Sequence, residues 1–239
     1  MLERASHRPL AKLAKILDLL QICYGKPKPP QLTDPYEMLL HRNAGYPQSD
    51  DLCDKGFLAL QAAIGLEPEK ILAAPAAKLR EAMRGSGMKP ELRARRLKEI
   101  AARILDEFSG DLRAALRRSP AKARAALKQF STVGDSTAEK ILLFAKIAPV
   151  AALPSNCIHV PLRLGLGADP ALAQPNWSRA YRSAQEAIAA QLPENFPARL
   201  RAYQLLKTHG QQTCKLANPL CDDCPVSRVC PFYLHQPLF

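Results

Sequence analysis

Four cysteines near the C-terminal end of the 239-residue sequence have a spacing suited to binding metal. They follow the pattern C-x6-C-x2-C-x5-C and are Cys214, Cys221, Cys224 and Cys230. Four thiolates brought together by tight turns can hold a tetrahedral zinc ion or an iron–sulfur cluster. Zinc sites usually combine two short cysteine pairs, whereas only the middle spacing is short here. The wider outer spacings therefore favour the larger cluster over zinc or free thiols.

A second segment, from Phe130 to Phe144, predicts two helices joined by a tight turn that contains Gly134. A turn of this kind points backbone N–H groups outward at a helix N-terminus, where the macrodipole also favours an anion. Such a hairpin can bind one DNA phosphate without reading the base sequence. The alternative is an ordinary helical hairpin with no ligand. The residues expected to contact the phosphate are Thr132, Val133, Gly134 and Ser136.

The charge of the chain favours a polyanionic partner. Lys and Arg exceed Asp and Glu by 12, and residues 80–128 hold 14 basic and six acidic side chains. Within this stretch, Arg93, Arg95 and Arg96 crowd onto two helical turns. We expect these arginines to contact DNA phosphates. The alternative is a solvated helix face.

The elements that must position these residues are predicted to be helices throughout, so the fold class is all-α. No alternation of apolar and polar residues persists, and 21 prolines and 11 glycines divide the chain into short helical segments. Leu10, Leu13, Leu17 and Leu20 indicate an amphipathic N-terminal helix. No apolar run approaches the roughly 20 residues that a membrane span needs. The predicted helices are 10–23, 35–44, 51–64, 68–73, 76–86, 91–108, 112–117, 120–127, 136–147, 156–164, 177–191 and 197–209.

The cysteine spacing is the signature of the endonuclease III family of DNA glycosylases, where it ligates a [4Fe–4S] cluster. The hairpin resembles that family's L-P-G-V-G-x-[KS]-T-A motif, and the resemblance extends from about Pro35 to Cys230. It implies a two-lobed helix-hairpin-helix glycosylase fold. A six-helix domain is expected over 39–148, and an iron–sulfur cluster domain over 1–38 plus 149–239. It also implies damaged duplex DNA as partner, a monomer without membrane attachment, and a cytoplasmic, nucleoid-associated location.

The resemblance is broken at the positions that carry the chemistry. Bifunctional members have a Lys in the hairpin that attacks the sugar, and Ser136 stands there in this chain. Pro154 stands where the family's Asp stabilises the cationic sugar, within a segment that otherwise matches. A third segment resembles the one whose Gln fills the gap left by an extruded nucleotide. Pro47 replaces that Gln, so its neighbours Tyr46 and Gln48 are expected to contact DNA.

Three functions remain open from the sequence. The first is a DNA-binding protein of the base-excision-repair superfamily that recognises damaged or distorted DNA, without the usual catalytic Lys and Asp. The second is a monofunctional DNA N-glycosylase that uses a displaced acid or nucleophile, for which the candidates are Lys140, Asp135 and Glu139. The third is a small iron–sulfur electron carrier.

Overall fold

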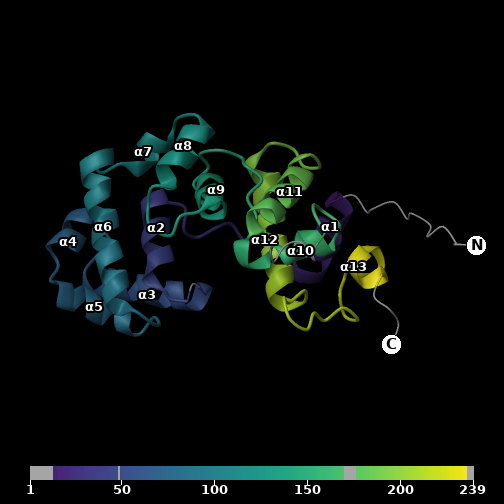
Figure 1. Ribbon diagram of the computed structural model, residues 1–239, viewed down its shortest axis with the longest axis horizontal. Coiled ribbons are helices and arrows are strands. Elements are labelled where there is room, and N and C mark those ends of the chain that lie inside the picture. Colours follow the sequence, from purple (N-terminus) through teal and green to yellow (C-terminus); the bar gives the residue numbers. More distant parts are fainter. Residues whose placement is uncertain (1–12, 48, 170–175, 236–239) are drawn as a thin grey trace, which may run out of the picture. The chain divides into compact units, whose positions relative to one another are not determined.

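The computed structural model of this chain describes residues 13–47, 49–169 and 176–235 (Figure 1). The prediction of an all-α fold is confirmed, because helices are the regular elements of these residues. In the described residues, strand-like pairing is limited to one isolated bridge between Tyr46 and Gly87.

The chain divides into two compact units, each with its own buried core. Unit 1 combines the two ends of the sequence, Met1–Pro29 and Pro149–Phe239, and unit 2 is Pro30–Ala148. Residue 39, where the sequence suggests a domain boundary, lies inside a helix of unit 2.

Unit 2 contains eight helices in its described residues, two more than the expected six. The additional elements are short, since α4 has six residues and α7 has five. Helix α6 lies at the centre and packs against α2, α4 and α5, burying Leu97, Ile100 and Ile104. The helices are α2 (Pro35–Ala44), α3 (Asp50–Ala63), α4 (Pro68–Ala73), α5 (Ala76–Arg84), α6 (Pro90–Phe108), α7 (Leu112–Leu116), α8 (Pro120–Leu127) and α9 (Asp135–Phe144).

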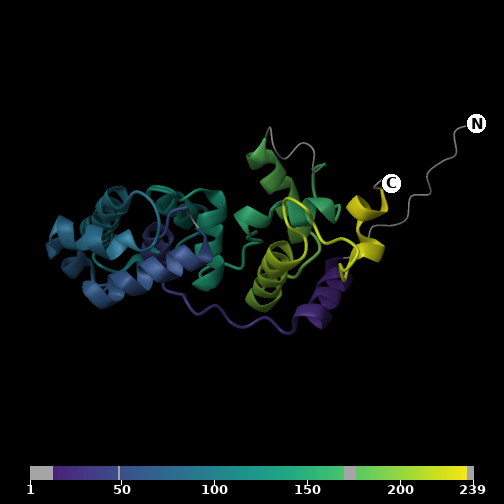
Figure 2. The same cartoon turned by 90° about the horizontal axis from the view of Figure 1, so that it is seen from below.

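Unit 1 is built on helices from opposite ends of the chain. Both views place α1 beside α12 (Figure 1 and Figure 2). The leucines predicted to form an apolar stripe are buried in the core, as Leu13, Leu17 and Leu20 show, whereas Leu10 lies outside the described residues. The helices are α1 (Leu13–Tyr24), η1 (Ser155–Cys157), α10 (His159–Arg163), α11 (Trp177–Ala189), α12 (Phe196–Gln212), η3 (Ser227–Val229) and α13 (Pro231–Leu234).

Proline and capping residues explain where many helices begin. Proline occupies the first turn of α2, α4, α6, α8, α12 and α13, where a missing N–H has no cost. The side chains of Asp34 and Ser119 cap α2 and α8.

One helix that was predicted as continuous is interrupted in the structure. The stretch 156–164 is not continuous: η1 ends at Cys157 and α10 begins at His159. Pro161 within this stretch has no N–H to donate, which disfavours a long regular helix.

Candidate metal pocket and nucleic-acid interface

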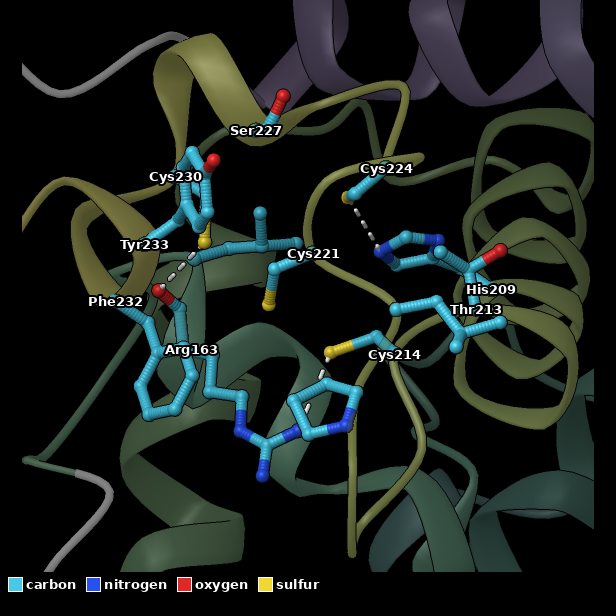
Figure 3. Close-up of a pocket in the computed structure, with 13 residues that line it drawn as sticks. Arg163, His209, Thr213, Cys214, Cys221, Cys224, Ser227, Cys230, Phe232 and Tyr233 are labelled. Carbon is cyan, nitrogen blue, oxygen red and sulfur yellow. Dashed lines mark hydrogen bonds between the residues drawn. The ribbon is translucent and has the colours of Figure 1, made fainter. Parts of the chain in front are cut away.

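The four C-terminal cysteines line a single small pocket, of about 20 Å³, in unit 1. Cys214 follows α12, Cys221 and Cys224 lie in the loop beyond it, and Cys230 immediately precedes α13. Figure 3 shows their sulfurs facing the same space. Within the described ranges, however, no three His, Cys, Asp or Glu side chains are grouped so that they could hold a metal ion.

Helix α10 anchors the loop that carries the first cysteine. The Arg163 guanidinium donates to the carbonyl oxygens of Lys215 at 2.7 Å and Leu216 at 2.9 Å, and lies 3.5 Å from Cys214 Sγ. It also stacks 4.6 Å from the centre of the Phe232 ring. One buried cation thus ties both ends of the cysteine segment to α10.

A chain of polar contacts reaches the pocket from α1. The Tyr24 hydroxyl oxygen lies 2.8 Å from His209 Nδ1 and 2.7 Å from Thr213 Oγ1. On the other side of the ring, His209 Nε2 lies 3.8 Å from Cys224 Sγ (Figure 3). Burial, with a smaller contribution from the nearby His159, lowers the pKa of His209 to about 4, which favours the neutral ring at pH 7.

Burial also governs the thiols. It raises the pKa of Cys224 to about 11 and raises the pKa values of Cys221 and Cys230, and neighbouring cysteines add to each shift. A pocket that makes thiolates unfavourable by themselves is stabilised by a cationic group that takes up their charge.

The hairpin of unit 2 connects α8 to α9 through residues 128–134. Thr132 stands where the family's motif has its first Gly, and its φ of 71° lies in the left-handed region that glycine favours. Helix α2 holds this conformation: Arg42 Nε donates to the Thr132 carbonyl at 3.1 Å, and Thr132 Oγ1 donates to Asn43 Oδ1 at 3.2 Å. Hydrogen bonds with α2 therefore hold Thr132 in a left-handed backbone conformation that a glycine would adopt more readily.

The first turn of α9 is open to a ligand. Gly134 is the N-cap, no side chain caps the turn, and a Cβ built at Gly134 would meet no atom within 4 Å. N–H groups at an uncapped helix start are available to an external acceptor. Val133 and Ser136 are both buried beside this turn, so the backbone is the part of the hairpin that faces out.

The displaced candidates for chemistry have partners within unit 2. Asp135 is 2.7 Å from Lys128 Nζ, and Glu139, whose side chain is 2% exposed, is 3.0 Å from Arg124. Lys140 Nζ lies 5.4 Å from the centre of the Phe144 ring. Pro154, at the carboxylate position, is buried and its carbonyl accepts from the Cys157 amide at 2.9 Å. The two ion pairs fasten α8 and the turn after it to α9.

The prediction that Arg93 contacts phosphate is wrong. Its side chain is 2% exposed, and its donors are satisfied by four backbone carbonyls and the Ser86 hydroxyl. Arg95 is exposed and pairs with Glu99 at 3.3 Å, and Arg96 is half-buried. The signal that could have placed Arg93 is its phase: it precedes Leu97 and Ile100 by four and seven residues, on the buried stripe of α6.

Exposed cations that sequence reasoning did not single out lie beside α7 and on α8. Arg117, Arg118 and Lys122 are exposed and have no acidic partner in the described part of the chain. They surround the start of α8, about 12 Å from the hairpin by the rise of the helix.

Tyr46 is held against the α5–α6 connection. Its amide donates to the Ser86 carbonyl at 3.2 Å, its carbonyl accepts from Met88 at 2.8 Å, and Lys89 Nζ lies 5.4 Å from the ring centre. Tyr46 is thus fixed, half-buried, in the connection between α2 and α3. Gln48 lies outside the described residues.

Every helix in the described ranges is too short or too polar to cross a membrane.

No family model matches the chain. It is 27% identical to Endonuclease III of Sulfolobus acidocaldarius over 180 residues, covering 74% of this chain and 73% of the relative. It is 28% identical to Thymine-DNA glycosylase of Aeropyrum pernix over 166 residues, covering 70% and 69%.

Solved structures give the same result for the fold. A non-covalent Endonuclease III–DNA complex superposes with a TM-score of 0.73 at 20% identity, covering 93% of this chain and 95% of that one. A thermostable thymine-DNA glycosylase gives 0.67 at 20% identity, covering 93% and 97%. The fold is that of a helix-hairpin-helix DNA glycosylase. The chain is endonuclease III-like in fold and in sequence, and the resemblance predicted from its motifs is confirmed.

Proposed function

We propose that this chain binds duplex DNA that is damaged or distorted, as a member of the base-excision-repair superfamily that grips the phosphate backbone without cutting base from sugar. The observation that carries the proposal is the hairpin: Thr132 in a left-handed conformation is followed by an uncapped first turn of α9. A backbone of this form suits a single phosphate and is indifferent to base sequence. Such a role would place the protein at the nucleoid.

Charge around the hairpin supports the same partner. Arg117, Arg118 and Lys122 are exposed cations near the start of α8, which leads directly into the turn. Polyanion binding draws most of its affinity from contacts of this kind. Tyr46, half-buried in the α2–α3 connection, supplies an aromatic side chain for a disturbed base step.

Several residues argue against the usual chemistry. Ser136 is buried and Pro154 has no side chain that could hold charge or accept a proton. Asp135 and Glu139 are engaged in ion pairs with Lys128 and Arg124. Losing a charge that stabilises a cationic sugar costs several kcal/mol of transition-state stabilisation. Binding without cleavage is therefore the function that the site supports best.

A [4Fe–4S] cluster held by Cys214, Cys221, Cys224 and Cys230 fits the cysteine pocket. Zinc sites usually combine two short cysteine pairs. Here four cysteines line one pocket at spacings of six, two and five residues, which supports the larger cluster. Once ligated by four thiolates, the cluster fastens the C-terminal segment and offers no open position to substrate.

Fluorescence anisotropy with a labelled duplex containing an abasic site tests binding. Gly134→Ala places a methyl group over the turn while meeting no atom of the protein, so it should weaken binding at least tenfold with stability changed by about 1 kcal/mol or less. Wild-type affinity in the folded variant would show that the hairpin does not bind the phosphate.

A lesion panel tests whether chemistry survives. Duplexes carrying uracil, oxidised guanine, thymine glycol or an alkylated base are incubated with the protein, treated with alkali and examined for strand cleavage, and a duplex with an abasic site is examined without alkali. No product above background is expected. Cleavage at any lesion, abolished by Glu139→Gln, Asp135→Asn or Lys140→Gln, would replace the proposal with that of an active N-glycosylase.

A further inference from the structure

We propose that Tyr24 positions the His209 ring so that its Nε2–H donates a hydrogen bond to the Cys224 thiolate when the pocket holds its cluster. The inference rests on the proposed cluster and adds a residue of α1, which lies outside the segments that resemble the family. Tyr24 and His209 are 185 residues apart in sequence and belong to the same unit.

The directions of the hydrogen bonds follow from counting protons. A ligating thiolate has no proton and can only accept, so His209 Nε2, 3.8 Å from Cys224 Sγ, must be the donor. In the tautomer whose proton is on Nε2, the ring offers Nδ1 as an acceptor for the Tyr24 hydroxyl, whose oxygen lies 2.8 Å away. The Tyr24 and Thr213 hydroxyl oxygens lie 2.7 Å apart, and because hydroxyl protons rotate, Thr213 can donate to Tyr24 once the Tyr24 proton is directed at Nδ1. With these directions Thr213, Tyr24 and His209 each donate one proton, and the chain of hydrogen bonds ends at the Cys224 thiolate.

Tyr24 is held in place by the packing of two helices. Arg201 on α12 donates to Gln21 Oε1 and Asp18 Oδ1, both at 2.7 Å, and Leu17 and Leu20 are buried in the core of the same unit. Tyr24 is the last residue of α1, about one turn beyond Gln21. Its hydroxyl therefore reaches His209 from a rigid element, which fixes both the ring orientation and the tautomer.

The proposed hydrogen bond from His209 reaches Cys224 in surroundings where a donor stabilises a thiolate. Cys224 lies in a pocket with apolar walls, which include Leu164, Pro219 and Phe232. A hydrogen bond to a buried thiolate stabilises its negative charge. Because a reduced cluster is more negative than an oxidised one, donors to its sulfurs raise its reduction potential and hold the ligand to the iron.

The test uses purified full-length protein carrying its cluster, with Tyr24→Phe as the main variant. The ring is kept and one hydroxyl is removed, so initial iron content should match the wild type. The midpoint potential of the cluster should shift to a more negative value, and visible absorbance should bleach several-fold faster with an iron chelator. Thr213→Val should shift both in the same direction by less.

Tyr181→Phe is the matched control, because Tyr181 is a buried tyrosine of unit 1 whose hydroxyl accepts from the Leu153 amide at 3.3 Å and which does not line the pocket. It should leave potential and bleaching unchanged. An unchanged potential in Tyr24→Phe, or an equal shift in Tyr181→Phe, would overturn the proposal. A wild-type protein that contains no iron would instead refute the proposed cluster, and this outcome differs from a failure of the Tyr24 proposal alone.

Discussion

Thr132 is a β-branched residue in a conformation that usually belongs to glycine. A left-handed backbone costs a residue with a Cβ on the order of 1 kcal/mol or more. Hydrogen bonds with Arg42 and Asn43 on α2 offset this cost. The hairpin is therefore held by its neighbours, and a motif search that demands glycine at this position would undervalue it.

Two substitutions separate these contributions. Thr132→Gly removes the strain and the hydroxyl hydrogen bond together, so the free energy of unfolding should change by about 1 kcal/mol or less, with DNA affinity retained. Thr132→Val keeps the strain and removes the hydrogen bond, so it should destabilise by about 1 kcal/mol or more. Urea unfolding measures both. Equal destabilisation by the two variants would contradict this account.

At the scale of elements, Arg93 fastens three segments of unit 2. Its guanidinium donates to Ala44 at the end of α2, to Met83 on α5, and to Gly87 in the connection that leads into α6. Two of these carbonyls lie at helix ends, where backbone acceptors have no partner within the helix. One side chain thus satisfies the ends of two helices and fixes the loop that supports Tyr46.

Arg93→Lys tests this arrangement. A lysine ammonium has three donors on a flexible stem and cannot match a guanidinium that serves five acceptors. We expect a loss of about 3 kcal/mol in the free energy of unfolding, measured by urea denaturation. Arg95→Lys, on the exposed side of the same helix, is the control and should change stability by no more than about 0.5 kcal/mol. A loss in Arg93→Lys as small as that in the control would contradict the anchoring role.

The exposed cations around the start of α8 predict a salt effect. Removing one phosphate-binding cation should reduce the slope of log affinity against log salt by about 0.9. Arg117→Gln with Lys122→Gln should therefore lower the slope by nearly two units and weaken binding to all duplexes alike. Lys78→Gln with Arg80→Gln removes equal charge from α5 and should leave the slope unchanged. Similar changes of the slope in both double variants would show that the net charge of the protein, and not binding at the start of α8, sets the salt dependence.

Helix positions were largely predictable from the sequence, because apolar periodicity and proline mark them locally. The boundaries of α2, α4 and α8 agree with those predicted. What could not be predicted depends on tertiary partners. The burial of Arg93 requires carbonyls from three segments, and the hydrogen bonds of Thr132 require a helix about 90 residues earlier. Glu139 and Tyr24 also find their partners only in the folded chain.

At the scale of the whole molecule, the two units have separate cores and depend on the cysteine pocket to different extents. Removing the proposed cluster with chelator and oxidant should open unit 1 around residues 213–231, since that segment has little regular structure of its own. Limited proteolysis with mass spectrometry should then cut this segment first and leave 30–148 intact. Equal cleavage of both units would contradict their independence.

The discontinuity of unit 1 has a consequence for synthesis on the ribosome. Helix α1 emerges first, yet its partner α12 begins about 170 residues later. At a synthesis rate of about 5–20 residues per second, roughly ten to thirty-five seconds pass before α12 can pack on the apolar face of α1. Unit 2 emerges complete within that interval. The nascent chain thus carries the apolar face of α1 uncovered while unit 2 is being synthesised.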